Sequence, residues 1–497
     1  MTIMLVFAIV ATAFGSWLLT FVTRPLAVRW QAVDHPTGGR KIHTRTLPRL
    51  GGVGIALAIA SMIILGLRLH WFAGTELQPL QLQGLLTALL ILLIVGVLDD
   101  RYELSPTPRL IAYCVCCAVV ILSGTRIAHI THPSGGVWTV PIWLGVPLTF
   151  AWLLAVTFAT KFMDGLDGLV AGQTVIGAGL IALLSFSPLF YEPSVGLLAL
   201  IVLAAFLGFL PVNLHPAKQF LGETGSTLAG FTLGFLAVAS GAKVATAFMA
   251  LGVPLADAAL VIIGRLLRGV SPFQGDDTHL HFKLVRAGLT HRQVVVLFWL
   301  IAGTFGITAL GLQTKGKMLL TGAIIALTAL LSFVTRLLPR KRGLFFLLVP
   351  PLALLLFTST IAVTRTTEEW RARPRVVFVH DKRLVVELAL TPIEQERGLG
   401  GRATIPNDHG MLFVFHNADI YPLWMKGMRA PIDMLWIQDG IIVEMAEQMP
   451  PPKSSNDTPL THTPSVSADR VLELASGGVK RYHLHVGDDV GVLTMMP

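Results

Sequence analysis

The chain has 497 residues, of which 53% are hydrophobic and 13% are charged. Soluble proteins carry about a quarter of charged residues, so this composition excludes a wholly soluble protein. The charges are also unevenly distributed, with 24 basic and 12 acidic residues in 1–364 but 14 basic and 17 acidic residues in 365–497. We therefore expect a membrane-embedded domain over residues 1–364 and a soluble domain over residues 365–497.

The net charge of +9 does not indicate nucleic-acid binding. In proteins that cross a membrane several times, basic residues mostly hold loops on the cytoplasmic side. The three cysteines, Cys114, Cys116 and Cys117, fall in one apolar stretch without metal-ligand spacing. We therefore expect neither a disulfide framework nor a cysteine metal site.

Apolar stretches long enough to span a bilayer recur along the first 364 residues. A helix of about 20 apolar residues crosses the hydrocarbon layer. The sequence predicts about 11–12 transmembrane helices, at 3–23, 51–69, 81–98, 108–124, 141–159, 169–187, 194–212, 226–241, 244–263, 293–312, 318–336 and 344–363.

The distribution of Lys and Arg between the loops gives the expected orientation. With the N-terminus outside, the cytoplasmic side holds 19 Lys and Arg residues and the outer side holds five. Such an asymmetry is typical of multi-pass proteins of the bacterial cytoplasmic membrane. An even number of spans then places residues 365–497 on the outer face. Apolar runs at 375–379 and 384–388, separated by turn residues, predict a mainly β fold there.

Pairs of carboxylates lie at the predicted cytoplasmic boundary. Asp99 and Asp100 end one apolar span, and Asp164 and Asp167 lie between two spans. Such carboxylates are either solvated loop charges or ligands of a cation, because an unpaired carboxylate at a membrane boundary is costly. Carboxylates beside Arg, Lys and His are what a magnesium–polyphosphate site requires.

Five separate motifs follow one another in the membrane part. They are residues 34–52 (with DHP, RKIH and PRLGG), 99–100 (DD), 162–169 (FMDGLDGL), 213–226 (with NLHPA and FLGETGS) and 271–281 (SPFQGDDTHLH). In this order they resemble the polyprenyl-phosphate N-acetylhexosamine-1-phosphate transferases, the WecA/MraY family. The last motif is similar to the WecA-like branch.

This resemblance implies a phosphoglycosyl transferase. A UDP-N-acetylhexosamine would donate its sugar-1-phosphate to a polyprenyl (undecaprenyl) phosphate in the membrane and release UMP. This is the first lipid-linked step of cell-envelope polysaccharide synthesis. The resemblance implies Mg²⁺ as cofactor, with Mn²⁺ as an alternative, and it allows a homodimer.

The resemblance also assigns roles to residues of this chain. It implies catalytic roles for Asp99, Asp100, Asp164, Asp167, His279 and His281. It implies metal binding by Glu223, Asp100 and Asp164. It implies substrate binding by Lys41, His43, Lys161, Asn213, Phe220 and Arg265. Asp99 is the preferred general base if the reaction uses one.

Four positions depart from the family pattern. Glu223 replaces the usual Asp, Phe158 and Lys161 replace two amides, and Phe282 replaces a histidine. The ammonium of Lys161 could pair with a phosphate, pair with Asp164, or occupy the place of magnesium. The alternatives to an active transferase are a catalytically degenerate scaffold of the same fold and a transporter or flippase. Transporters place ionisable groups near the bilayer midplane, where Asp257 is almost the only acid.

The last domain resembles a different family. Residues 410–415, 424–426, 430–433 and 471–474 are similar to domain of unknown function 192, a small secreted family. This resemblance implies a fold and an outer-face location, and it assigns neither an activity nor a partner. His483 and His485, if on a strand, would face the same side of it and could share a metal.

Overall fold

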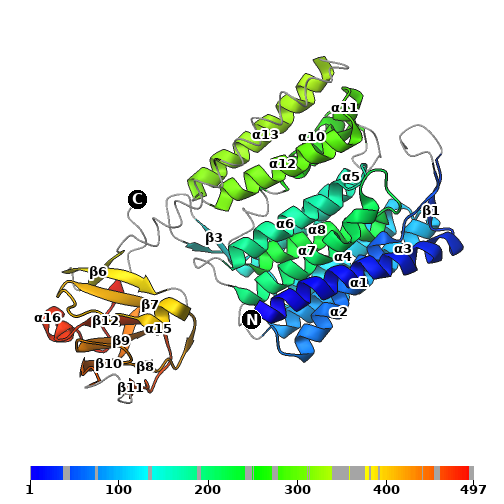
Figure 1. Ribbon diagram of the computed structural model, residues 1–497. Helices are drawn as coiled ribbons and strands as arrows, with labels where there is room; N and C mark the ends of the chain where they lie inside the picture. The colour runs from blue at the N-terminus through cyan, green and yellow to red at the C-terminus, as the bar shows by residue number, and fades with distance from the viewer. Residues whose placement is uncertain are drawn as a thin grey trace. The chain divides into compact units, whose positions relative to one another are not determined.

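The computed structural model describes residues 2–36, 45–72, 77–131, 137–186, 192–240, 251–270, 278–310, 314–337, 375–379, 382–389, 392–438, 440–452 and 459–491, with single positions 249, 312 and 358. The chain divides into two compact units, Met1–Thr364 and Arg365–Pro497 (Figure 1).

The first unit is helical. Among its described residues, seven helices are long and apolar enough to cross a membrane, and two shorter apolar helices accompany them. The long ones are α1 (Thr2–Arg29), α2 (Gly51–Arg68), α3 (Pro79–Tyr102), α5 (Ile142–Met163), α7 (Pro193–Asn213), α12 (His291–Leu310) and α13 (Thr314–Leu337). The shorter apolar ones are α4 (Pro106–Leu122) and α6 (Leu169–Ser185), and further helices are α8 (Gly222–Ala239), α10 (Gly252–Leu266) and α11 (Leu280–Arg286).

These helices confirm the prediction of a polytopic membrane protein. Helices α1 to α8, α10, α12 and α13 each overlap one predicted span. The predicted span 344–363 and the first part of 244–263 lie outside the described residues, apart from single positions. Several helices extend past the predicted ends, and two of these extensions carry site residues: α5 continues to Met163 and α8 begins at Gly222. Lys161 and Glu223 in these extensions pair with each other.

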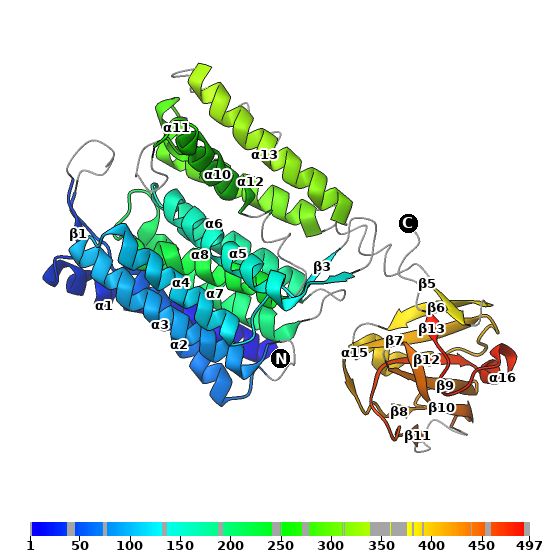
Figure 2. The same cartoon turned by 180° about the vertical axis from the view of Figure 1, so that it is seen from behind.

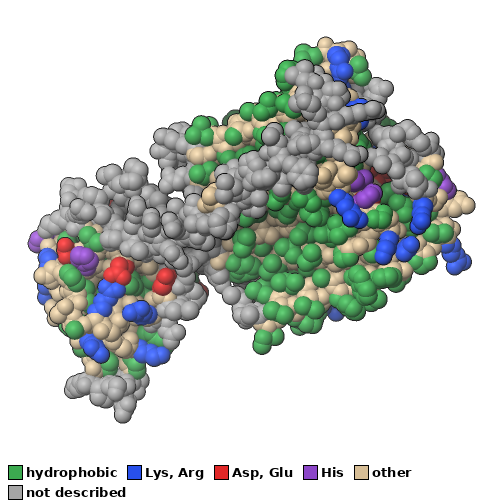
Figure 3. All heavy atoms as spheres, turned by 45° about the horizontal axis from the view of Figure 1, so that its top comes forward, with side chains coloured by type: hydrophobic (Ala, Val, Ile, Leu, Met, Phe, Trp, Pro, Cys, Tyr) green, Lys and Arg blue, Asp and Glu red, His purple; other side chains and the backbone are tan. Residues whose placement is uncertain are grey.

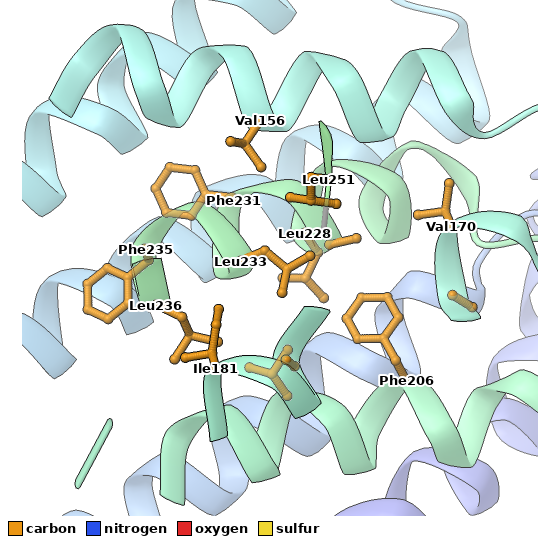
Figure 4. Close-up of a cluster of buried hydrophobic side chains, with 14 of the residues drawn as sticks. Val156, Val170, Ile181, Phe206, Leu228, Phe231, Leu233, Phe235, Leu236 and Leu251 are labelled. Atoms are coloured by element: carbon orange, nitrogen blue, oxygen red, sulfur yellow. The ribbon is translucent and has the colours of Figure 1, made fainter. Parts of the chain in front are cut away.

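Helix α8 forms the centre of the bundle. Every residue from Thr224 to Val238 is buried, and α8 packs against α2, α3, α5, α6 and α7. Phe231 and Phe235 of α8 lie among Val156 of α5, Ile181 of α6 and other apolar side chains (Figure 4). A helix that is apolar on all sides is typical of a membrane bundle core.

Glycines bring the neighbouring helices close to α8. A Cβ at Gly52 of α2 would lie 2.1 Å from the backbone nitrogen of Gly225, and a Cβ at Gly230 would lie 2.3 Å from the Thr160 hydroxyl of α5. Close packing through small residues is a common way for helices to associate in membranes. It holds α5 and α8, which carry Lys161 and Glu223, against their neighbours.

The outer surface of the bundle is apolar. Phe7, Val10, Phe14 and Phe21 of α1 are each about half exposed or more. Figure 3 shows hydrophobic side chains over much of one face of this unit, with Lys, Arg and His gathered toward one end. An exposed apolar surface of this extent indicates contact with lipid.

Short backbone pairings tie loops together at one end of the bundle. Strand β1 (Val33–Asp34) pairs with β2 (Leu47–Pro48). The Pro48 carbonyl accepts from the Phe220 amide at 2.9 Å, and the Phe220 carbonyl accepts from the Gly51 amide at 3.1 Å. These bonds attach the loop before α2 to the loop before α8. A second hairpin pairs β3 (His129–Thr131) with β4 (Val137–Thr139).

The second unit confirms the predicted mainly β fold (Figure 2). Its described strands include a seven-stranded sheet in the order β10-β9-β12-β7-β6-β5-β13, in which β6 and β7 are parallel and the other pairs antiparallel. The strands are β5 (Arg375–Val379), β6 (Lys382–Ala389), β7 (His409–Asp419), β9 (Ile432–Gln438), β10 (Ile441–Met449), β12 (Ala468–Ala475) and β13 (Val490–Gly491). Strand β8 (Leu423–Trp424) pairs with β11 (Thr461–His462), and α15 (Pro392–Arg397) and α16 (Gly478–Tyr482) complete the unit.

The two ends of the large sheet are joined. Ile442, near the start of β10, accepts from the Gly487 amide at 2.8 Å and donates to the Asp488 carbonyl at 2.9 Å, beside β13. The core contains Leu435, Trp436 and Leu472, all fully buried. His483 and His485 follow α16 and do not lie on a strand, so the argument for a shared metal on one strand face does not hold.

Candidate active site

A cavity of about 1090 Å³ lies at the end of the helical unit where β1 and β2 pair. Its walls come from the end of α3, the α5–α6 loop, the α7–α8 loop and the first turn of α8. It brings together eight of the residues that the sequence selected, which are Asp99, Asp100, Lys161, Asp164, Asp167, Asn213, Phe220 and Glu223.

Of the other selected residues that the structure describes, His279, His281 and Arg265 are buried and do not line the cavity, although His281 Nε2 lies beside Gly165 of its wall. Phe282 and His291 line the wall. Lys41 and His43 lie outside the described residues. The sequence therefore grouped the aspartates correctly in space, while its histidine motif reaches the cavity through Phe282.

Asp99 and Asp100 occupy the last turn of α3. Arg109 Nη1 of α4 lies 3.3 Å from Asp99 Oδ2, and the Glu223 amide donates to Asp100 Oδ1 at 2.9 Å. Each aspartate keeps one buried oxygen, Asp99 Oδ1 and Asp100 Oδ2, that accepts no hydrogen bond from the described residues. Buried carboxylate oxygens without a donor are costly unless a cation binds there.

Lys161, Glu223 and Tyr113 form a compact group. Lys161 Nζ lies 2.5 Å from Glu223 Oε1, and the Tyr113 hydroxyl donates to the same oxygen. Lys161 Nζ is also 3.4 Å from the Tyr113 hydroxyl. The sequence offered Asp164 as a protein partner for Lys161, whereas the described ion pair of Lys161 is with Glu223, which the sequence did not suggest.

Asp164 caps the C-terminus of α5 and lines the cavity between the other acids. Its side chain is exposed to the cavity, which protein surrounds on several sides. Desolvation, together with the charges of Glu223 and Asp167, raises the pKa of Asp164 to about 7. A carboxylate in such surroundings favours a proton or a cation beside it.

Asp167 organises a second part of the wall. Its Oδ2 lies 2.8 Å from His215 Nδ1 and accepts from the Ala217 amide at 3.1 Å. The Asp167 amide in turn donates to His291 Nε2 at 2.9 Å, and the two imidazoles stack with their centroids 4.4 Å apart. Ligand atoms of Asp167, His215 and His291 lie within 4.8 Å of one another, but their mutual hydrogen bonds already provide them with partners.

Asn213 supports the same loop from below. Its side-chain oxygen accepts from the Gly168 amide at 3.1 Å, and its nitrogen donates to the Gln219 carbonyl at 3.1 Å. Asn213 is 4% exposed, so it joins the α5–α6 and α7–α8 loops more than it presents a surface to a nucleotide. Phe220 lines the cavity, where a ring can stack on a base.

Several residues of the cavity and its surroundings were not individual candidates from the sequence, among them His215, Arg109, His291 and Tyr113. His215 lay inside a quoted motif, and Arg109 counted only as a loop charge. His291 begins α12 with no distinguishing pattern, and Tyr113 is a single tyrosine in an apolar stretch. Only spatial convergence shows their roles, because their partners are distant in the chain.

The donor set fits a divalent cation such as Mg²⁺. Hard cations take oxygen ligands, and Asp99, Asp100 and Asp164 offer carboxylates toward one cavity. The two oxygens without donors described above supply an independent indication. Glu223 is less available, because Lys161 and Tyr113 already bind one of its oxygens.

The comparisons with known proteins agree with the location of this cavity. The family described as Glycosyl transferase family 4 matches residues 82–241. A Bacillus subtilis (strain 168) protein named "Probable undecaprenyl-phosphate N-acetylglucosaminyl 1-phosphate transferase" is 30% identical over 318 residues, covering 63% of this chain and 86% of the relative. The chain belongs to glycosyl transferase family 4.

Further members of glycosyl transferase family 4 match over a similar length. A decaprenyl-phosphate N-acetylglucosaminephosphotransferase of Mycolicibacterium smegmatis is 29% identical, covering 66% of this chain and 87% of the relative. An undecaprenyl-phosphate alpha-N-acetylglucosaminyl 1-phosphate transferase of Yersinia pestis is 28% identical, covering 58% and 78%. The resemblance drawn from the motifs is thereby confirmed.

The second unit matches the family described as Uncharacterized ACR, COG1430, over residues 375–492, which confirms the likeness to domain of unknown function 192.

Proposed function

We propose that the protein transfers N-acetylglucosamine-1-phosphate from UDP-N-acetylglucosamine to a polyprenyl phosphate and releases UMP. The observation that carries this proposal is the carboxylate-lined cavity, whose walls come largely from the family-matched residues 82–241. The names of the relatives supply the substrates.

An oxygen of the lipid phosphate would attack the β-phosphorus of the UDP-sugar. The bond between that phosphorus and the oxygen bridging to the α-phosphate would break, and UMP would leave with the bond's electron pair. The second pKa of a phosphate monoester is about 6, so the nucleophile is mostly a dianion at neutral pH. Bringing two anions together is then the main barrier, and a general base is not required.

Cations in the cavity address this barrier. We propose that Asp99, Asp100 and Asp164 hold Mg²⁺, with Mn²⁺ as an alternative, which neutralises phosphate charge when bound. Arg109, paired with Asp99 near the start of α4, is suited to receive the lipid phosphate. The phosphate would enter from the membrane boundary, where α3 ends and α4 begins.

The part of the cavity wall around Asp167 and His215 suggests where the nucleotide binds. Asp167 holds His215 and the Ala217 amide, so it fixes the loop that carries Phe220. We propose that this loop binds the uridine part of the donor and that Phe220 stacks on uracil. His279 would act by positioning, since it lies behind Phe162 and does not line the cavity.

We propose further that residues 1–364 form the transferase domain with its cavity on the cytoplasmic side, and that residues 365–497 lie outside. The excess of Lys and Arg in the cytoplasmic loops supports this orientation. Protease added to intact spheroplasts should remove the β-rich unit and leave the helical unit. Cleavage that requires lysed cells would contradict the orientation.

A degenerate scaffold is the second candidate, favoured by the pairing of Lys161 with Glu223. The substitution Lys161→Asn distinguishes the scaffold from the active transferase. If turnover rises in this variant, the lysine has impaired catalysis, and the chain is degenerate. If turnover falls, the lysine takes part in the transfer reaction.

The reaction type is tested by following the donor's β-phosphate. UDP-N-acetylglucosamine labelled with ³²P at the β-position should transfer its label to the lipid fraction. A simple glycosyl transfer would leave the label in UDP, and that result would contradict the proposal.

A further inference from the structure

Lys161 places a positive charge among the carboxylates of the cavity. Its ammonium lies 2.5 Å from Glu223 Oε1, and its side chain is 18% exposed while that of Glu223 is 11% exposed. The ammonium also lies 5.5 Å from the centroid of the Tyr113 ring. Three helices, α4, α5 and α8, each contribute one member to this group.

The positions of the two charges favour their pairing. Lys161 lies in the last turn of α5 and Glu223 in the first turn of α8. A cation at a helix C-terminus and an anion at a helix N-terminus are both stabilised by the aligned backbone dipoles. The partial burial of the pair strengthens the attraction over that of a surface salt bridge.

The rest of the Glu223 contacts hold the same arrangement. The Tyr113 hydroxyl donates to the oxygen that Lys161 contacts, so two donors converge on Glu223 Oε1. The Glu223 amide is held by Asp100 Oδ1 at 2.9 Å. Binding a metal ion through Glu223 Oε1 would require breaking contacts with both the ammonium and the hydroxyl. At the other carboxylate oxygen, the nearby ammonium charge opposes a divalent cation.

By contrast, the neighbouring aspartates keep oxygens available. Asp99 Oδ1 and Asp100 Oδ2 are buried and accept no hydrogen bond from the residues that the structure describes. A cation entering the cavity therefore meets carboxylate oxygens of Asp99 and Asp100 whose binding costs no existing contact.

We propose that Lys161 is a built-in cation of the site that engages Glu223 and removes it from the ligands of a divalent ion. The ion is then held by the aspartates and binds more weakly than it would without the ammonium. This inference rests on the proposed function only in taking the cavity as a metal–phosphate site. It makes Lys161 a residue that sets metal affinity, while its charge remains beside the substrate phosphates.

The test measures Mn²⁺ binding to the full-length protein in lipid nanodiscs by electron paramagnetic resonance, which reports free Mn²⁺. Lys161→Met keeps a similar side-chain length and removes the charge. We expect it to bind Mn²⁺ about tenfold more tightly, or better, which corresponds to about 1.4 kcal/mol. Equal or weaker binding than in the unmodified protein would overturn the proposal.

The double variant Lys161→Met/Glu223→Gln is the matched control, because it removes both charges of the pair and leaves neither buried alone. If Glu223 is not a ligand in the unmodified protein, the double variant keeps the original Mn²⁺ affinity. A large loss of affinity in the double variant would show that Glu223 is a ligand and would overturn the proposal. This arm decides the matter even if Lys161→Met alone does not fold.

Neither arm contains a sugar nucleotide or a lipid phosphate. A failed transfer assay would therefore leave the Mn²⁺ result intact and count only against the proposed function. A failed Mn²⁺ result would leave lipid-dependent UMP release intact and count only against the role of Lys161.

Discussion

Asp257 and His279 form a buried pair, with Asp257 Oδ2 2.8 Å from His279 Nδ1. The other oxygen, Asp257 Oδ1, accepts from the Leu280 amide at 3.0 Å. One carboxylate of α10 thus holds both the side chain and the backbone at the start of α11. The His279 ring stacks on Phe162, with centroids 5.6 Å apart, two residues before Asp164. The pair therefore links the histidine segment to the cavity wall.

Loss of this anchor should impair turnover. In Asp257→Asn, the amide keeps the shape but loses the charge and one acceptor, so the segment that carries His279 and Phe282 shifts. Misplacement of site residues by about 1 Å can cost about 100-fold in rate, and we expect a fall in kcat of that order. UMP release measures it. The control is Ser332→Ala, which removes the hydrogen bond that Lys283 of α11 donates to the Ser332 hydroxyl. The kcat of this control should stay within about twofold of that of the unmodified protein. A kcat for Asp257→Asn as high as that control would refute the link.

Gly222 allows the close approach that brings α8 to Asp100. Its φ is +71°, and a Cβ there would lie 2.1 Å from the Arg49 carbonyl and 2.5 Å from Asp100 Oδ2. We expect Gly222→Ala to abolish measurable transfer and to destabilise the protein by about 1–3 kcal/mol, the usual cost of such strain.

Gly264 of α10 offers a matched glycine, since a Cβ there would meet nothing within 4 Å. Gly264→Ala should leave transfer unchanged and should stabilise the protein slightly, because alanine is the better helix former. Transfer assays and thermal unfolding compare the two variants. Equal effects of the two substitutions would show that crowding at Gly222 does not determine activity or stability.

Arg109 should bind the lipid phosphate. Hydrogen bonds to charged groups contribute about 1.5–3 kcal/mol, so Arg109→Gln should raise the KM for polyprenyl phosphate about tenfold or more. The KM for UDP-N-acetylglucosamine should change little. Arg126→Gln, just beyond the opposite end of the same helix, is the comparison and should alter neither constant. An effect of Arg109→Gln confined to the UDP-sugar would assign this arginine to the other substrate.

Glu473 makes the stability of the β-rich unit depend on pH. Burial raises its pKa from 4.5 to about 7, although the Leu399 amide and Arg402 lower it. Between these values the folded unit retains a proton that the unfolded chain has lost, so stability falls as pH rises from 4.5 through 7. The contribution is on the order of 3 kcal/mol.

Glu473→Gln should remove this slope. Hydrogen exchange at the β12 amides of the intact protein reports the stability of this unit across the pH range. Glu447→Gln, an exposed acid on β10, should keep the slope of the unmodified protein. If Glu473→Gln behaves like Glu447→Gln, the buried carboxyl is not the origin of the pH dependence.

Hydropathy and motif order predicted most of this architecture. The apolar spans are local signals, and the aspartates of the motifs meet because each lies near a helix end at the same end of the helical bundle. The β-rich unit was also visible from alternating strands and turn residues. These features depend on neighbouring residues in the chain, which a sequence displays directly.

The partners within the site were not predictable in the same way. Lys161 and Glu223 are 62 positions apart, and their contact depends on how α5 packs against α8 through glycine. Asp257 was interpreted as an isolated mid-span acid, whereas it anchors His279 from another helix. Tyr113 gave no signal at all, because its role depends entirely on which side chains converge on it.

The most direct test of the account is UMP release by the purified full-length protein. The assay supplies undecaprenyl phosphate, UDP-N-acetylglucosamine and Mg²⁺, with omission of the lipid and addition of EDTA as separate arms. We predict release that requires the lipid, stops in EDTA and returns when Mg²⁺ is restored. Absence of release with this donor and with a panel of other UDP-sugars, or release that does not need the lipid, would contradict the proposed transferase.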